Sequence, residues 1–320
     1  MIATCYYSWA RRIVILLRRR LSASYTGAAA TRIDGKTVLS TFAERLRQAS
    51  ERNKSLLCVG LDPDPERMPV KDVFEFNRAI IDATEDLVCA YKPNLAFYES
   101  LGEEGHQALR RTLEHIPDDI PVIADSKRGD VQSTSRFHAT AIFDVWGFDA
   151  TTVNPYGGHD AVQPFLDYQD KGVFVWCRSS NPSAKELQDL IVTDPDSGER
   201  RPLYEWVAIR ASAWNKSGNV GLVVGATYPE ELRRVRELCP EMPVLIPGIG
   251  AQLGALEESV AHGVDRSGFN AIFSVSRGII YASDDVHDFA EAARSEADAV
   301  RERINIDLET YRPSAARARD

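Results

Sequence analysis

Short apolar runs alternate with amphipathic stretches along most of the chain. Eight of these runs are rich in β-branched and aliphatic residues and end in polar or glycine-rich residues. Several, such as GVFVWC and GLVVG, show no alternation of polar and apolar positions, which is typical of a strand buried on both faces. We therefore predict strands at 56–62, 88–94, 121–127, 148–156, 172–179, 220–227, 243–249 and 270–277.

The stretches between these runs have helical periodicity. Apolar residues recur at Val73, Phe76 and Ile80, and again at Leu232 and Val235, at the spacing that places them on one face of a helix. Eight strand-helix units that close on themselves form a (β/α)8 TIM barrel, whose usual size is about 250 residues. We predict an α/β fold with a single such barrel over residues 38–304, which comprise 267 positions.

An open, doubly wound sheet is the structural competitor, because it uses the same alternation of strands and helices. Its fingerprint is a glycine-rich turn directly after an early strand. The candidate, Gly248-Ile249-Gly250 with Gly254, follows the seventh predicted strand and has the wrong spacing for its third glycine. The pattern therefore favours the barrel over a dinucleotide-binding sheet.

The two ends of the chain differ from this repeating part. Residues 1–37 form a basic head that we expect to be disordered or the product of a misplaced start, with a transit peptide as the alternative. The apolar run at 13–17 is far shorter than the roughly 20 residues of a membrane-spanning helix. Residues 305–320 are expected to be a polar C-terminal tail.

The longest connection between predicted strands runs from Ser179 to Val220. It is expected to be either a lid over the site or a solvated insertion.

Charge is unevenly distributed along the sequence. The 320 residues carry a formal net charge of −9, yet residues 1–33 contain six arginines and no acidic residue, so residues 34–320 carry −15. An acidic body does not attract nucleic acid or an anionic membrane surface, so we expect neither as a partner. Five scattered cysteines without metal-ligand spacing indicate reduced thiols and a cytoplasmic location.

Charged residues collect at the C-terminal ends of the predicted strands, where TIM barrels place their active sites. Asp125 and Lys127 stand two positions apart in one strand, so we expect their side chains on the same face. Asp62 and Lys92 follow two other strands, and Asp130 lies in a loop that could bring it to this site or to that of a neighbouring subunit. Carboxylates around Lys127 keep its ammonium group charged, which suits a proton donor better than a Schiff-base nucleophile.

The last two strand ends carry an anion-binding pattern. The PGIG of 247–250 leads into a helix expected to begin near Ala251, and SRG at 276–278 follows the eighth strand. Backbone N–H groups at a helix start and a guanidinium group together suit a phosphate, although a structural turn and a surface arginine are the alternative. The six histidines have neither HxH nor HxxxH spacing, so we expect no metal site and no cofactor.

Seven motifs occur in order along residues 39–304. They are GLDPDP at 60–65, AYKPN at 90–94, DSKRGDVQST at 125–134, TVNPY at 152–156, CRSSNP at 177–182, PGIGAQ at 247–252 and SRGI at 276–279. Together they resemble the orotidine 5′-phosphate decarboxylase family, and the forms KRGD, NPY and GIGAQ resemble its type 2 branch. The DxKxxD pattern alone is shared with related enzymes that act on sugar phosphates.

This resemblance implies decarboxylation of orotidine 5′-monophosphate (OMP) to UMP and CO2 without a cofactor, the last step of de novo pyrimidine nucleotide synthesis. In the family a charged array surrounds the C6 carboxylate of the pyrimidine, with one lysine protonating C6; the matching residues are Lys92, Asp125, Lys127 as the proton donor, and Asp130. The substrate-binding residues that it implies are Asp62 for the ribose, Ser180 for the pyrimidine, Arg277 for the phosphate, and Thr134, Gly250, Gln252 and Gly278.

The resemblance also implies a homodimer in which Asp130 and Thr134 reach the active site of the partner subunit. Gln132 departs from the pattern, because the family usually has glycine there, and its larger side chain could crowd the subunit boundary. Two other functions stay open. One is a metal-dependent sugar-phosphate decarboxylase, synthase or isomerase of the same barrel superfamily, which EDTA would inactivate. The other is a phosphate-ligand binding protein without turnover.

Overall fold

A computed structural model describes residues 30–33, 36–249 and 253–311, and the chain divides into two units between Ser40 and Thr41. In the first unit, strand β1 (Ala30–Ile33) pairs antiparallel with strand β2 (Lys36–Leu39). The expected boundary between residues 37 and 38 therefore falls inside a paired strand. Residues 1–29 and 34–35 of the expected head lie outside the described part of the chain.

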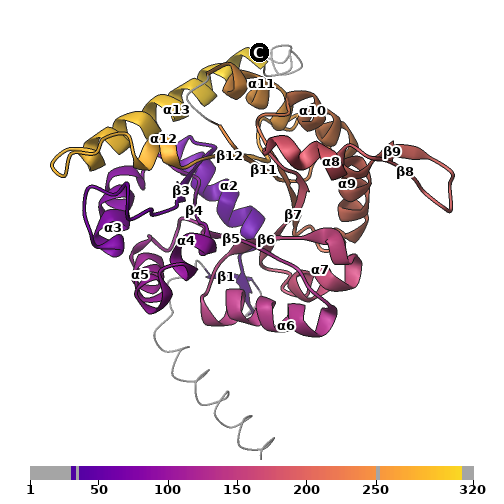
Figure 1. Ribbon diagram of the computed structural model, residues 1–320, viewed down its shortest axis with the longest axis horizontal. Helices are drawn as coiled ribbons and strands as arrows, with labels where there is room; N and C mark the ends of the chain where they lie inside the picture. The colour runs from indigo at the N-terminus through magenta and orange to yellow at the C-terminus, as the bar shows by residue number, and fades with distance from the viewer. Residues whose placement is uncertain (1–29, 34–35, 250–252, 312–320) are drawn as a thin grey trace, which may run out of the picture. The chain divides into compact units, whose positions relative to one another are not determined.

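Eight parallel strands form the barrel of the second unit (Figure 1). Neighbours follow the order β4-β3-β12-β11-β10-β7-β6-β5, and two further bridges, Tyr91 with Val122 and Asn94 with Asp125, join β4 to β5 and close the ring. The predicted (β/α)8 barrel is confirmed, and each strand lies within one residue of its predicted run. The strands are β3 (Leu57–Leu61), β4 (Ala90–Pro93), β5 (Ile123–Arg128), β6 (Ala150–Val153), β7 (Gly172–Arg178), β10 (Val220–Val224), β11 (Val244–Pro247) and β12 (Ala271–Val275).

Helices surround the barrel (Figure 1), and side-chain caps mark the starts of some of them. Thr41 and Glu44 form a capping box at the start of α2, and the Asp72 carboxylate accepts two backbone N–H groups at the start of α3. The helices are α2 (Phe42–Asn53), α3 (Val73–Thr84), α4 (Leu95–Glu99), α5 (Gly102–His115), α6 (Gln132–Thr140), α7 (His159–Leu166), α8 (Lys185–Gln188), α9 (Leu203–Trp214), α10 (Pro229–Leu238), α11 (Leu253–Gly263), α12 (Arg277–Ile280) and α13 (Phe289–Tyr311), with short π or 3-10 turns at Ala141–Val145, Pro155–Gly157 and Pro182–Ala184.

Helix α13 continues past the boundary expected at residue 304. Asp307 is buried and its two carboxylate oxygens share the single Nε–H of Arg303, and Leu308 packs against the core. Residues 305–311 are therefore part of the barrel unit rather than a separate tail. In the described ranges, no helix is both long and apolar enough to cross a membrane.

The long connection between β7 and β10 has secondary structure of its own. It contains α8, α9 and a β-hairpin of β8 (Ile191–Thr193) and β9 (Arg200–Pro202). In the turn of this hairpin, the Asp194 carboxylate accepts the backbone N–H groups of Asp196 and Ser197. Trp206 Nε1 of α9 donates to the Val192 carbonyl oxygen at 3.0 Å. Figure 1 shows this hairpin extending sideways beside α9, an arrangement that favours an exposed insertion over a lid for this stretch.

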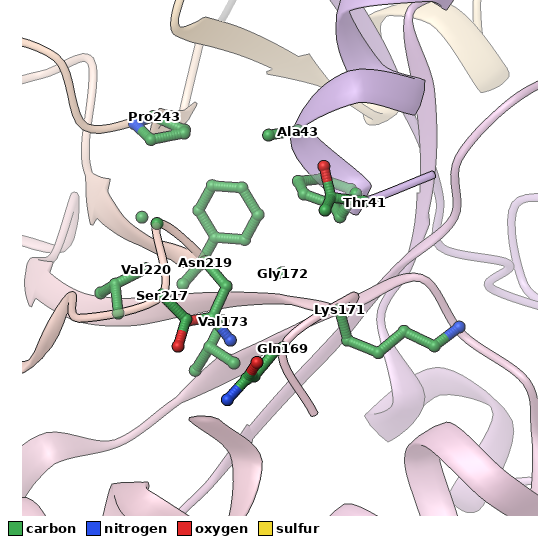
Figure 2. A pocket seen from close by; sticks show the side chains of 14 residues that line it. Thr41, Ala43, Gln169, Lys171, Gly172, Val173, Ser217, Asn219, Val220 and Pro243 are labelled. Atoms are coloured by element: carbon green, nitrogen blue, oxygen red, sulfur yellow. The ribbon is translucent and has the colours of Figure 1, made fainter. Parts of the chain in front are cut away.

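Helix α2 closes the N-terminal end of the barrel. Phe42 of this helix reaches the apolar interior, where its ring meets that of Phe174 edge to face at 5.7 Å. Gly172 allows this contact, because a Cβ atom there would lie only 2.4 Å from the Phe42 ring. A cavity of about 60 Å³ remains beside the contact, between Thr41 and Asn219 (Figure 2). This end of the barrel is therefore a packed plug, and the strands open at the other end.

Replacing Phe42 with alanine should lower the free energy of unfolding by about 3 kcal/mol, because truncation of a buried ring leaves a cavity between α2 and the barrel interior. The matched control is Ile306→Ala on the exposed side of α13, which should cost less than about 0.5 kcal/mol. Equilibrium denaturation in urea measures both changes. A Phe42→Ala protein as stable as the Ile306→Ala protein would contradict the plug.

Candidate active site

The C-terminal ends of the strands surround a cavity of about 130 Å³. Its lining combines charged and polar side chains with Val223 and Leu245, which belong to the apolar interior. Because parallel strands of a barrel all end at the same rim, residues far apart in the sequence meet there. The lining residues that matter for the chemistry are Lys92, Asp125, Lys127, Thr152, Arg178 and Ser180.

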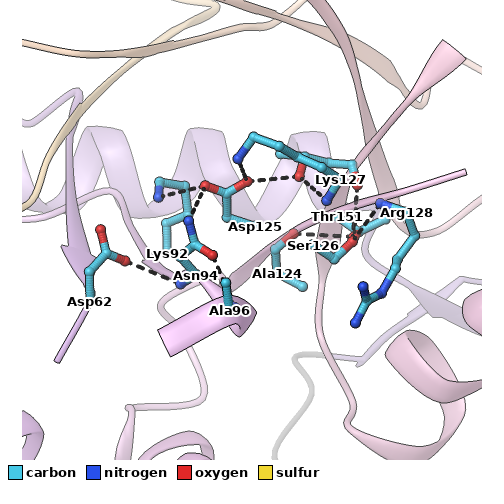
Figure 3. Close-up of polar contacts among 11 residues, drawn as sticks. Asp62, Lys92, Asn94, Ala96, Ala124, Asp125, Ser126, Lys127, Arg128 and Thr151 are labelled. Atoms are coloured by element: carbon cyan, nitrogen blue, oxygen red, sulfur yellow. Dashed lines mark hydrogen bonds and ion pairs between the residues drawn. The ribbon is translucent and has the colours of Figure 1, made fainter. Parts of the chain in front are cut away.

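Asp125 is the centre of this site. Its Oδ1 atom accepts a hydrogen bond from Lys127 Nζ at 2.7 Å and another from Thr152 Oγ1 at 2.9 Å. Its Oδ2 atom lies 3.3 Å from Lys92 Nζ and 3.4 Å from Asn94 Nδ2. Figure 3 shows the carboxylate between the Lys92 and Asn94 side chains on one side and Lys127 on the other. Each oxygen therefore has two donors, which stabilise the ionised form.

The charges in this cluster support one another. Burial opposes ionisation of Asp125, but Lys92 and Lys127 outweigh it and hold the pKa of the carboxyl group well below its usual range. Burial also opposes the charge on Lys92, yet Asp125 and Asp62 outweigh it and raise the pKa of this ammonium group. Burial raises the pKa of the neighbouring Cys58 thiol to about 12, so the thiol is neutral near pH 7. The stable arrangement is one carboxylate between two ammonium groups.

The two lysines differ in access to the cavity. The Lys92 side chain is 5% exposed, whereas that of Lys127 is 37% exposed. Lys92 therefore acts as a buried counter-ion. Lys127 is more accessible and lines the cavity.

Strand β5 is irregular where it carries these charges. Its register with β6 jumps from Ala124 opposite Thr151 to Arg128 opposite Val153, so the three residues 125–127 face a single residue of β6. Lys127 has a φ of 44°, in the left-handed region that side-chain-bearing residues seldom adopt. Asp125 and Lys127 do meet as expected, but a bulged strand brings them together rather than the regular alternation that we assumed.

Asp62 and Asn94 border the charged cluster. The backbone N–H of Asn94 donates to Asp62 Oδ1 at 3.2 Å, and the Asn94 side chain caps α4 by accepting from the Ala96 N–H. Tyr281 fixes the Asp62 backbone, since its hydroxyl donates to the Asp62 carbonyl oxygen at 2.9 Å.

The sequence analysis did not predict Asn94 and Thr152 as site residues. Asn94 lies in the AYKPN motif at a helix N-cap position, and that is the signal that could have identified it.

Asp130 stands apart from the charged cluster. It is exposed, and its Oδ1 accepts a hydrogen bond from the N–H of Val131. Among the described residues, no hydrogen bond or ion pair joins Asp130 to Asp125 or to a lysine. Thr134 is half-buried in α6. The structure therefore brings together three members of the expected four-residue array within one subunit, and leaves the fourth at the surface.

The expected phosphate-binding residues are only partly described. Ser180 lines the cavity, and Arg277 and Gly278 are exposed at the start of α12. No carboxylate in the described part of the chain pairs with Arg277. Gly250 and Gln252, together with the helix start expected near Ala251, lie outside the described residues. Within 30–33, 36–249 and 253–311, no group of three or more His, Cys, Asp or Glu residues is placed to hold a metal ion.

Comparison with known proteins identifies the family. The sequence profile described as "Orotidine 5'-phosphate decarboxylase / HUMPS family" matches residues 55–292, which include all eight barrel strands. The chain belongs to the orotidine 5′-phosphate decarboxylase / HUMPS family. The charged cluster, the cavity and Arg277 all lie within the part of the chain that matches this family.

Individual relatives in the orotidine 5′-phosphate decarboxylase family are similar over most of their length. Orotidine 5′-phosphate decarboxylase from Thermomicrobium roseum is 54% identical over 271 residues, which cover 82% of this chain and 95% of that protein. Orotidine 5′-phosphate decarboxylase from Dehalococcoides mccartyi strain BAV1 is 50% identical over 265 residues, which cover 82% of this chain and 97% of that protein. The solved structure of Leishmania donovani OMP decarboxylase superposes with a TM-score of 0.74 at 40% identity, covering 84% of this chain and 99% of that one.

Replacing Asp125 with asparagine should lower the free energy of unfolding by about 3 kcal/mol at pH 7, because the buried ammonium group of Lys92 loses its nearest counter-ion. The pKa of Asp125 is lower in the folded than in the unfolded chain. Its stabilising contribution is therefore complete above about pH 4 and is lost as the pH falls further. Urea denaturation should show the parent and Asp125→Asn proteins becoming more alike below pH 4.

The control for this series is Asp196→Asn, at an exposed position in the turn of the β8-β9 hairpin. It should leave the stability within about 0.5 kcal/mol of the parent protein from pH 7 to pH 3. If the difference between the parent and Asp125→Asn proteins were the same at pH 7 and pH 3, the lysines would not be holding Asp125 ionised.

Proposed function

We propose that this chain converts OMP to UMP and CO2 without a cofactor, as the last step of de novo pyrimidine nucleotide synthesis. The observation that carries the proposal is the cluster of Lys92, Asp125 and Lys127 in the barrel mouth, in a chain about half identical to enzymes named orotidine 5′-phosphate decarboxylase. The sugar-phosphate alternative is not favoured, because these relatives carry the decarboxylase name.

The chemistry follows from the charges in the cavity. The carboxylate on C6 of OMP would lie near Asp125, and loss of CO2 leaves an electron pair on C6. The ammonium group of Lys127 neutralises this developing charge and then supplies the proton that completes UMP. An ammonium group that is already fixed in place stabilises the charge more than bulk water does, because it needs no reorganisation during the reaction.

The rest of the substrate gives the binding energy that brings OMP into this position. Decarboxylation of this kind requires a lowering of the barrier of up to about 23 kcal/mol, more than one lysine supplies. Interactions with distant parts of a substrate contribute when they orient the reacting group. In the proposal Asp62 binds the ribose and Ser180 the pyrimidine. The phosphate is bound by Gly250, Arg277 and Gly278, and Gln252 is a lid contact. Arg277 supports this role, because it is exposed and pairs with no carboxylate of the residues that the structure describes.

The proposal includes a homodimer in which Asp130 and Thr134 contribute to the partner's active site. Asp130 makes no contact with the charged cluster of its own subunit in the described residues, and exposed apolar residues occur in the segments after β5 and β6. Val131, Phe137 and Tyr156 are 65%, 79% and 92% exposed. An apolar surface of this kind is typical of a subunit interface.

A cytoplasmic location is also part of the proposal. It is supported by the cysteines in the described part of the chain, which are buried free thiols, as expected in a reducing compartment. These are Cys58, Cys89, Cys177 and Cys239.

Purified protein should consume OMP at the same rate with and without EDTA. The reaction is followed as loss of OMP absorbance.

Replacing Lys127 with alanine should lower kcat about 1,000-fold or more, because both the proton donor and the charge opposite C6 are removed. The control is Lys216→Ala, an exposed lysine at the N-terminal side of the barrel, which should keep the parent rate. Equal rates for the Lys127→Ala and parent proteins would contradict the proposed role.

Mixing inactive variants tests the shared active site. In a mixed dimer of Lys127→Ala and Asp130→Ala subunits, one of the two sites receives both intact residues. Since about half of randomly mixed dimers are of this kind, an equimolar mixture should recover roughly a quarter of the parent activity. A mixture no more active than its two components, although subunits exchange, would show that each subunit has a self-contained site.

A further inference from the structure

Thr152 of β6 lies opposite the bulge that carries the two central charged residues. Its Oγ1 atom accepts a hydrogen bond from the backbone N–H of Lys127 at 2.9 Å and donates one to Asp125 Oδ1, also at 2.9 Å. Its carbonyl oxygen accepts from Ser126 Oγ at 3.0 Å. One residue of β6 is thus bonded to each of the three consecutive residues of β5 that leave the regular register.

The bulge needs such a partner. The pairing of β5 with β6 skips residues 125–127, so the N–H of Lys127 has no carbonyl group of β6 to bond. Buried backbone N–H groups are almost always bonded, and the Thr152 hydroxyl is the acceptor in this case. The left-handed backbone of Lys127 is intrinsically unfavourable and persists only where surrounding contacts impose it.

The direction of both hydrogen bonds is fixed by chemistry. An ionised carboxylate only accepts hydrogen bonds, and a backbone N–H only donates. The single proton of the Thr152 hydroxyl therefore goes to Asp125, while a lone pair receives the N–H of Lys127. Neither valine, which lacks the hydroxyl, nor an apolar residue of another shape can make both contacts.

Thr152 is a polar residue next to an apolar part of the barrel interior. Thr152 is 1% exposed and lines the cavity, two residues after Ala150 on the same face of β6. The interior positions beneath it are apolar, including Ile123 and Phe174. The neighbouring Thr151 bonds Ser126 Oγ and the Ala124 carbonyl oxygen, and has no hydrogen bond to either charged side chain.

We propose that Thr152 is a positioning residue, which fixes the Lys127 ammonium group and the Asp125 carboxylate relative to each other through one buried hydroxyl. The inference rests on the proposed decarboxylation of OMP and adds to it a residue that acts through the charged pair. A bound substrate then meets an ammonium group whose backbone and counter-ion are already held in place, so less reorganisation is needed during proton transfer.

The experiment compares three substitutions of Thr152 in the full chain. Thr152→Val keeps the shape and removes both hydrogen bonds, so kcat for OMP should fall about 10- to 100-fold. Thr152→Ser retains the hydroxyl and should stay within about threefold of the parent. Thr152→Ala lacks the hydroxyl and should behave like valine; it replaces Thr152→Val in the comparison if circular dichroism and gel filtration show that the valine protein is misfolded.

Two measurements separate positioning from a merely structural role. The KM for OMP and the inhibition constant of UMP should change less than about threefold in Thr152→Val, because the hydroxyl holds the charged pair rather than the nucleotide. The matched control is Thr112→Val, which removes a buried threonine hydroxyl from α5, bonded there to the Ala108 carbonyl oxygen. It should keep kcat within about twofold of the parent.

The outcomes distinguish this inference from the function on which it rests. A parent protein that does not consume OMP contradicts the proposed function, and the inference with it. If the parent is active, a kcat for Thr152→Val within threefold of the parent overturns the inference alone. The same conclusion follows if Thr152→Ser is as slow as Thr152→Val, or if UMP affinity falls in parallel with kcat.

Discussion

The ionised carboxylate of Asp125, buried between two lysine ammonium groups, is the interaction on which the rest of the site depends. A buried charge is strongly unfavourable alone, and a buried pair is stable only when its geometry is good and its other hydrogen bonds are made. Three adjacent strands meet these requirements together: β4 supplies Lys92, β5 supplies Asp125 and Lys127, and β6 supplies Thr152. A closed ring of strands keeps these groups from moving apart.

The two ends of the barrel serve different purposes. At the N-terminal end, Phe42 fills the space above Gly172 and completes an apolar interior. At the other end, Val223 and Leu245 of the same interior line the cavity that holds the charges. Electrostatic interactions are stronger in such surroundings than in water.

Sequence reasoning predicted the parts of this arrangement that depend on periodicity. Unbroken apolar runs identify buried parallel strands, and the rim of a barrel collects whatever charges follow them, which is why Lys92, Asp125 and Lys127 were predicted to meet. The bulge in β5 could not be predicted in this way, because it depends on how two strands pair. Thr152 looks like an ordinary strand former in the sequence, and only its neighbours across the sheet show what its hydroxyl contacts. The continuation of α13 past residue 304 could not be predicted for a similar reason, since Asp307 is held by contacts that polarity alone does not reveal.

The protonation state of Asp125 tests the account most directly, because every role given to the cluster requires this carboxylate to stay ionised. Carbon-13 NMR of protein labelled at the aspartate carboxyl carbons, assigned with the Asp125→Asn variant, measures it. The account predicts that the Asp125 signal does not titrate between pH 7 and pH 4, where an ordinary aspartate becomes about half protonated. A titration midpoint at or above pH 4 in the folded protein would contradict it.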